Sequence, residues 1–187
     1  MSKRIVVAAV VVALTLSAVA RAQAPAAPAP AAPAPGATLK AEYLAEVADV
    51  EKKIRALAEA IPEEKYGWRP APGVRSVGEV FGHITGGNYL LTRLAGAATP
   101  ADVPKDVENL ARKAEILAWL EKSFAHVHAS VEAATPEQLA KEIDFFGQKT
   151  TGRGLYFKAY GHMSEHLGQA IAYARSIGVT PPWSKGS

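Results

Sequence analysis

The stretch "LYFKAYGHMSEHLGQAIAYARSI", residues 155–177, decides how this chain is expected to fold. Its apolar residues recur every three or four positions, which is the period of one face of a helix. Gly178 follows as a helix-ending residue, and Pro181 and Pro182 prevent the helix from continuing. We therefore expect a long amphipathic helix from about Arg153 to Ile177. Its apolar face comprises Leu155, Ala159, Met163, Leu167, Ala170, Ala174 and Ile177.

Three further segments carry the helical period and complete the fold prediction. The first runs from about residue 39 to 60, with Thr38 as its N-cap and Pro62 as its stop. The second opens at Ser76 with the capping box S-x-x-E, and the third covers about residues 105–133. Four long amphipathic helices with no convincing set of strands predict an all-α fold, an antiparallel four-helix bundle.

The segments between the helices also carry patterns. The loop after the first helix contains Tyr66 and Trp68, which we expect to fold back onto the core. A short helical turn is predicted to start at Thr135, and residues 142–154 are expected to be irregular or extended. The apolar face of the third helix is expected to comprise Val107, Leu110, Ala114, Leu117, Phe124, Val127 and Val131.

The N-terminal residues 1–22 have the composition of a secretory signal peptide, with Lys3 and Arg4 before an apolar run and small residues after it. The apolar run is shorter than the about 20 residues that a membrane-spanning helix needs, so no stable membrane insertion is expected after cleavage. Residues 23–38 are rich in proline and alanine, which predicts an extended, disordered linker. We therefore expect an exported protein, periplasmic or secreted, whose folded domain covers residues 39–187.

Composition and missing motifs remove several classes of function. The chain has no cysteine, which excludes disulfides and thiolate metal sites. Its formal net charge of +3 derives from Lys3, Arg4 and Arg21, so the mature chain would carry 18 basic and 18 acidic residues and no nucleic-acid partner is expected. Neither H-E-x-x-H nor Glu-x-x-His occurs, so zincin proteases and ferritin-like di-iron bundles lack their ligand motifs.

Two histidines, His162 and His166, stand four residues apart in the last predicted helix. Residues at this spacing lie on one helix face, so both imidazoles can reach one ion. Gln169 and Tyr173 fall close to the same direction around the helix axis, which gives a stripe of four polar or aromatic side chains. The stripe borders the apolar face, and the spacing alone leaves open whether it is a metal site or a solvated surface.

A metal held by a protein usually has a third ligand from the chain. His126 and His128 point about 200° apart around the third helix, so they cannot both face one site. His83 lies among the inward positions of the second helix, and the pair Gly86-Gly87 predicts close approach by another helix or a ligand. With the histidine pair of the last helix, His83 would make a three-histidine site with positions open for water or substrate.

Two motifs resemble those of one protein family. The segment R-P-x-x-x-x-x-S-x-x-E-x-x-x-H at residues 69–83 and the motif H-x-x-x-H-x-x-Q at residues 162–169 resemble the DinB-like family, over essentially the whole predicted domain. The resemblance implies a four-helix bundle that holds a divalent metal ion by His83, His162 and His166. It also implies a homodimer, since family members commonly form dimers. The wider superfamily includes bacillithiol S-transferases and mycothiol-dependent maleylpyruvate isomerase.

The function expected from such a site is that of a metal-dependent transferase or hydrolase acting on a small molecule. Glu165 and Tyr173 are the candidate catalytic residues, for proton transfer and hydrogen bonding, and Gln169 is the candidate for orienting a ligand. Three neutral imidazoles suit zinc, nickel, copper or iron. Zinc is favoured because it needs no redox protection outside the cytoplasm, with nickel or iron as alternatives. The other interpretations are a non-catalytic module that binds a metal or a partner, and a purely structural bundle.

Overall fold

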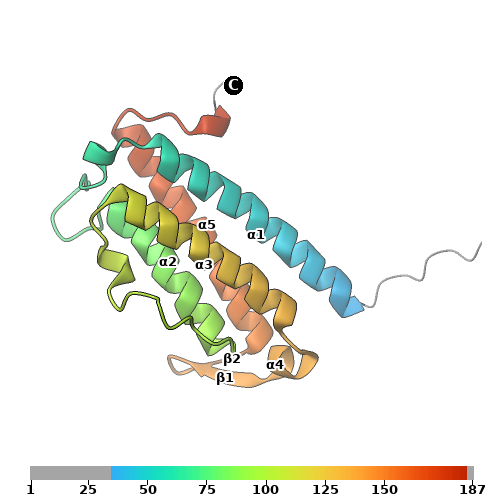
Figure 1. The fold of residues 1–187 in the computed structure, drawn as a ribbon. Coiled ribbons are helices and arrows are strands. Elements are labelled where there is room, and N and C mark those ends of the chain that lie inside the picture. The colour runs from blue at the N-terminus through green and yellow to red at the C-terminus, as the bar shows by residue number, and fades with distance from the viewer. Residues whose placement is uncertain (1–34, 185–187) are drawn as a thin grey trace, which may run out of the picture. The chain divides into compact units, whose positions relative to one another are not determined.

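The computed structural model of this chain describes residues 35–184, with side chains from residue 39. The predicted signal peptide and most of the predicted linker lie outside the described residues, and both stay predictions. Four long helices make up most of the described chain (Figure 1). They are α1 (Pro35–Ala60), α2 (Val77–Leu94), α3 (Lys113–Ala133) and α5 (Gly152–Ser176). Together they confirm the predicted four-helix bundle.

The long helices contact one another in a ring, in which α2 packs against α3 and α5 and α1 packs against the same two helices. The colours in Figure 1 show that α1 and α5 run in one direction while α2 and α3 run in the other. The contacting pairs α1/α3 and α2/α5 are therefore antiparallel. Between the parallel helices α2 and α3, residues 95–112 return along the length of the bundle and carry the 3₁₀ turn η2 (Val107–Asn109), which contacts α2. Such a long crossover is one of the known connections in four-helix bundles.

The buried face of the first predicted helix and the start of the second are both confirmed. The six apolar positions at helical spacing in the first segment are all buried. They are Tyr43, Val47, Val50, Ile54, Leu57 and, just after the end of α1, Ile61. The capping box of α2 is present, because Ser76 Oγ accepts from the Glu79 N–H while Glu79 Oε2 accepts from the Ser76 N–H. The start of α1 differs from the prediction. The helix begins at Pro35, so Thr38 lies inside it and is not its N-cap. Proline suits the first turn because its missing N–H would have no helical partner there.

The predicted start of the third helix is wrong. The sequence predicts a helix from residue 105, whereas α3 begins at Lys113 and residues 107–109 form the separate turn η2. Leu110 and Arg112 have extended backbone angles that interrupt the helix. Because the predicted face was counted from residues outside the helix, its first positions are shifted: Ala114 is exposed, whereas Ile116 and Leu120 are buried.

A small hairpin interrupts the otherwise helical chain. The predicted short helical turn is α4 (Pro136–Ala140), and it leads into the antiparallel strands β1 (Glu142–Phe145) and β2 (Gln148–Thr151). The turn between the strands places Phe146 and Gly147 at positive φ. The prediction of extended chain here is confirmed, but strands of four residues with mixed exposure give too short a pattern to reveal the pairing.

The loop between α1 and α2 folds back onto the core, as predicted from its aromatic residues. It includes the 3₁₀ turn η1 (Glu63–Lys65); a third such turn, η3 (Pro182–Ser184), follows α5. Tyr66 is buried and its hydroxyl donates to the Ala58 carbonyl, while Trp68 is half-buried against the core. None of the helices in residues 35–184 has the length and apolar content that crossing a membrane would require.

Candidate metal centre

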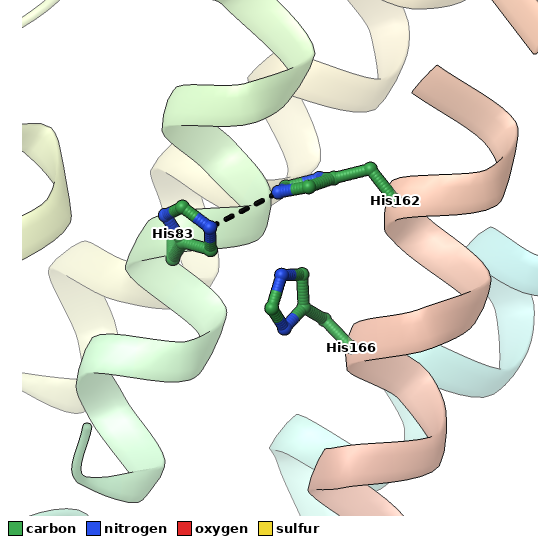
Figure 2. Close-up of side chains that lie close together, drawn as sticks. All are labelled: His83, His162 and His166. Carbon is green, nitrogen blue, oxygen red and sulfur yellow. Dashed lines mark hydrogen bonds between the residues drawn. The ribbon is translucent and has the colours of Figure 1, made fainter. Parts of the chain in front are cut away.

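Three histidines from two helices converge at one place in the bundle. His83 comes from the middle of α2, and His162 and His166 come from successive turns of α5, as Figure 2 shows. The ring centroids lie 4.5 to 4.8 Å apart, and one nitrogen from each ring lies within 4.8 Å of the others. All three side chains are half-buried. The structure therefore brings together the three residues that the sequence predicts as metal ligands.

The position of His162 depends on a glycine of the facing helix. A Cβ atom on Gly87 would lie 2.3 Å from Cε1 and 2.7 Å from Nδ1 of His162, distances at which no side chain could remain in place. The sequence predicts close approach at this glycine, which is confirmed. The group that occupies the space is the imidazole of His162, from α5.

A carboxylate determines the orientation of His83. Its Nδ1–H donates to Oε2 of Glu108, at 2.9 Å, because a carboxylate oxygen can only accept. The proton therefore stays on Nδ1, and Nε2 carries the free lone pair. This Nε2 lies 3.1 Å from Nε2 of His162, on the side of the ring that faces the other two histidines (Figure 2).

Two consecutive hydrogen bonds orient His166, as Glu108 orients His83. Its Nδ1–H donates to Oε1 of Gln169 at 2.8 Å, and Nε2 of Gln169 donates to the hydroxyl of Tyr173 at 3.0 Å. The indole of Trp68 packs edge-on against the ring of Tyr173, with centroids 5.4 Å apart. Nε2 of His166 is therefore also unprotonated and available to a ligand. Two residues predicted to assist the site, Gln169 and Tyr173, thus act on a histidine in this structure.

His162 has the most perturbed environment of the three. Burial, with smaller contributions from His166 and His83, lowers the pKa of His162 to about 4, and burial also lowers the pKa of His166. Both imidazoles are therefore neutral at pH 7. Within the described residues, Nδ1 of His162 is buried and has no hydrogen-bond partner. When its Nε2–H donates to Nε2 of His83, the ring leaves one polar atom unsatisfied, which costs about 1–3 kcal/mol.

These residues fit a divalent metal ion. With metal–nitrogen bonds of about 2.1 Å, two ligands of a tetrahedral ion lie about 3.4 Å apart, close to the 3.1 Å between Nε2 of His83 and Nε2 of His162. Neutral imidazoles whose other nitrogen is held by an acceptor are the usual form of histidine ligands, and His83 and His166 have this form. A cation between the two Nε2 atoms would take the place of the shared proton. The donor set leaves coordination positions for water or substrate, as in catalytic rather than structural zinc sites.

The remaining predicted residues lie away from this cluster or at its edge. Glu165 is exposed on α5, and its charge is close enough to raise the pKa of His166 slightly against the effect of burial. His126 stacks near Tyr89, and His128 pairs with Glu51 at 2.9 Å. Both histidines belong to α3, and neither is in the cluster. The catalytic role of Glu165 stays a prediction.

Two residues near the cluster are absent from the sequence prediction. Glu108 was not predicted as a site residue, because the sequence places it inside a continuous third helix, whereas it belongs to the separate turn η2. Arg75, which precedes the N-cap of α2, lies 3.9 Å from Glu108 Oε2 and contributes to the lowered pKa values of His162 and His166. Gly82 and Gly86, one turn apart on α2, were the available signal that a segment lies close against this helix.

Comparisons with known proteins agree with the fold and with the family resemblance. The family model described as the DinB superfamily matches residues 46–170. YjoA of Bacillus subtilis is 32% identical over 129 residues, which cover 66% of this chain and 81% of YjoA. The crystal structure of YjoA, a DinB-like protein, superposes with a TM-score of 0.60 at 27% identity and covers 74% of this chain and 93% of YjoA.

Two further crystal structures show the same fold at lower identity. A DinB-like protein from Bacillus cereus has a TM-score of 0.62 at 20% identity and covers 75% of this chain and 93% of its own. YfiT from Bacillus subtilis, described as a probable metal-dependent hydrolase with an unusual four-helix bundle topology, has a TM-score of 0.57 at 18% identity. That match covers 75% of this chain and 89% of YfiT. At such identities the likeness concerns the fold.

Proposed function

This chain belongs to the DinB superfamily, and from that premise we propose that it is a metal-dependent hydrolase or transferase acting on a small molecule. The observation that carries the proposal is the convergence of His83, His162 and His166, each half-buried and within 4.8 Å of the others. A purely structural site would enclose its ligands and fill every coordination position. Partly exposed imidazoles with positions left open are what turnover requires.

Hydrolysis is the reaction class that we place first. YfiT, which shares the fold, is described as a probable metal-dependent hydrolase. Water is also the one co-substrate that any partly exposed site already has. Transfer to another nucleophile, such as a thiol, would use the same ion and the same open positions, and it is the alternative within this proposal.

The role that we propose for each residue follows from its contacts. A divalent ion would supply Lewis-acid chemistry, polarising a substrate oxygen or lowering the pKa of a bound water or thiol. His83, His162 and His166 would bind it, each as a neutral imidazole. Gln169 and Tyr173 orient His166, which is the role that we propose for them in place of direct contact with substrate.

Glu165 is the group that we propose for proton transfer. It is exposed on α5 next to His166, so its carboxylate can exchange protons with solvent. Its electrostatic effect on His166 supports this proposal. A carboxylate in this position could accept a proton from an attacking water and pass it to the leaving group.

Zinc is the ion that we propose, with nickel or iron as alternatives, because neutral imidazoles suit all three. We also propose that the domain acts after export, in the periplasm or outside the cell, where zinc needs no protection from oxidation. This part of the proposal rests on the signal-like composition of residues 1–22. A homodimer is proposed from the family resemblance.

Metal content tests the proposal directly. The purified protein should contain about one zinc per chain by elemental analysis, and the variants His83→Ala and His162→Ala should lose it. His126→Ala and His128→Ala are the matched controls, because these histidines lie outside the cluster and their removal should leave the metal content unchanged. Unchanged zinc in both ligand variants would overturn the three-histidine site. A screen of ester, amide and thiol-transfer substrates, with and without zinc, then identifies the reaction class.

A further inference from the structure

Glu108 is the one carboxylate that contacts the histidine cluster within the described residues, and nothing in the two family motifs includes it. It reaches the site from η2, on the long return between α2 and α3. Its Oε2 accepts from Nδ1–H of His83 at 2.9 Å. The side chain is 44% exposed, so it is not held by burial alone.

The fit between η2 and α2 holds this carboxylate in place. A Cβ atom on Gly82 would lie 2.6 Å from the backbone carbonyl oxygen of Glu108, and one on Gly86 would lie 2.7 Å from its Oε1. At Gly82 the close atoms are backbone, so only glycine there allows η2 to lie this close to the helix. At Gly86 the close atoms belong to the Glu108 side chain, which a larger residue would displace. The backbone of Glu108 lies against Gly82, and its carboxylate lies against Gly86, one helical turn further along α2. From there the carboxylate reaches His83, which stands between them in sequence.

The other ionic contact of Glu108 is weaker. Arg75 lies 3.9 Å from the same Oε2, and its side chain is 45% exposed. Exposed ion pairs of this kind contribute about 0–1 kcal/mol, so Arg75 does not account for the position of the carboxylate. The shorter contact, the 2.9 Å hydrogen bond to His83, is the one that matches the position of the carboxylate.

We infer that Glu108 is a positioning residue of the metal centre, and this inference rests on the proposed metal-binding function. By accepting from Nδ1–H, it keeps the lone pair of His83 on Nε2, the nitrogen that faces the cluster (Figure 2). Its negative charge also makes the imidazole a stronger donor to a cation. The centre is therefore asymmetric: His83 is backed by a charged group and His166 by the neutral amide of Gln169.

The test measures zinc affinity by competition with a chromophoric chelator in the wild type, Glu108→Gln, Glu108→Ala and Glu51→Gln. Glu51 is the matched control, since its Oε2 contacts Nε2 of His128 at the same 2.9 Å outside the cluster. Glu108→Ala should weaken zinc binding by about 10- to 100-fold, the range typical of lost outer-shell partners. Glu108→Gln keeps an acceptor oxygen but not the charge, so it should lose less zinc affinity than Glu108→Ala. Glu51→Gln should bind as the wild type does.

A second readout separates positioning from a general effect on the fold. Correlation of histidine ring nitrogens and protons by NMR in the metal-free protein should show His83 as the Nδ1–H tautomer, shifting toward Nε2–H in Glu108→Ala. Wild-type affinity in both Glu108 variants would overturn the inference while leaving the proposed function intact. Weaker binding with an unchanged tautomer and a lower melting temperature would also overturn it. Failure of the wild type to bind zinc would instead overturn the proposed function.

Discussion

At the scale of single residues, the geometry of the candidate centre depends on the absence of a side chain at Gly87. The imidazole of His162 occupies the space where a Cβ atom would be, 2.3 Å from Cε1. We predict that Gly87→Ala moves this imidazole and weakens zinc binding by about 10- to 100-fold, the range for changes that disturb how a ligand is held. Titration against a chromophoric chelator measures the effect.

The control for this substitution is Gly168→Ala on α5, where an added Cβ meets nothing within 4 Å. It should leave zinc affinity unchanged and raise the free energy of unfolding by about 0.5–1 kcal/mol, because alanine favours a helix more than glycine does. Zinc binding by Gly87→Ala as tight as in the wild type would show that the imidazole has room to move.

The protonation of His162 gives a second prediction at this scale. The pKa of His162 is lowered to about 4, mainly by burial, whereas in the unfolded chain it would have its ordinary value of 6.5. Between these values the unfolded chain binds a proton that the folded chain does not. The free energy of unfolding of the metal-free protein should therefore fall as the pH drops from 6.5 toward 4, and His162 should contribute no further change below 4.

Urea denaturation in the presence of a chelator, at several pH values between 7 and 4, measures this effect. His162→Gln is the comparison, since glutamine is polar but does not titrate. The stability of the wild type relative to this variant should decrease as the pH falls through the window. Parallel pH profiles for the two proteins would contradict the assigned role of His162.

The three histidines of the candidate centre could be predicted from the sequence, but their supporting residues only in part. The spacing of His162 and His166 fixes their shared face, because helix geometry relates positions four residues apart. Gln169 and Tyr173 lie on the same helix, so the same rule places them near His166. Glu108 comes from another element, and no local rule relates it to His83, 25 residues earlier.

At the scale of elements, helices with a clear start signal were predictable and the break before α3 was not. Ser76 and Glu79 mark the first turn of α2 by a local hydrogen-bonding pattern that the sequence displays. The interruption at residues 110–112 has no such signal, since apolar residues continue at helical spacing across it. Packing of η2 against Gly82 of α2 accounts for the break, and that contact is tertiary.

The capping box of α2 leads to a prediction about this element. Ser76→Ala should lower the free energy of unfolding by about 1 kcal/mol, because the Glu79 N–H loses its acceptor. Zinc affinity should change little, since His83 lies nearly two turns further along α2. Chemical denaturation and chelator competition on the same samples measure both quantities.

Ser176→Ala is the matched control at the end of α5. Its hydroxyl donates back to the Ala172 carbonyl, a bond that adds little to a helix, so the change in stability should be near zero. A loss of zinc affinity in Ser76→Ala as large as the expected loss in Gly87→Ala would mean that the first turn of α2 controls the position of His83.

At the scale of the whole molecule, the residues that form the hydrophobic core are distinct from those of the candidate metal centre. The residues that bury most completely lie along the seams among α1, α2, α3 and α5, whereas the three histidines stay half-buried between α2 and α5. Fold class followed from the sequence because apolar periodicity is repeated over many turns. The direction of α3 relative to α2 depends on the path of residues 95–112, which periodicity does not describe.

The pairing of His83 with His162 has a kinetic consequence, because 79 residues separate them in the chain. An ion can gain all three ligands only after α2 and α5 have docked, a long loop closure that belongs late in folding. Zinc should therefore slow unfolding more than it accelerates folding. Stopped-flow unfolding in denaturant, with and without zinc, measures this, and His83→Ala should be insensitive to zinc. If zinc raised the folding rate and left the unfolding rate unchanged, the centre would form early in folding. If zinc lowers the unfolding rate as expected, the ion sets the lifetime of the native state.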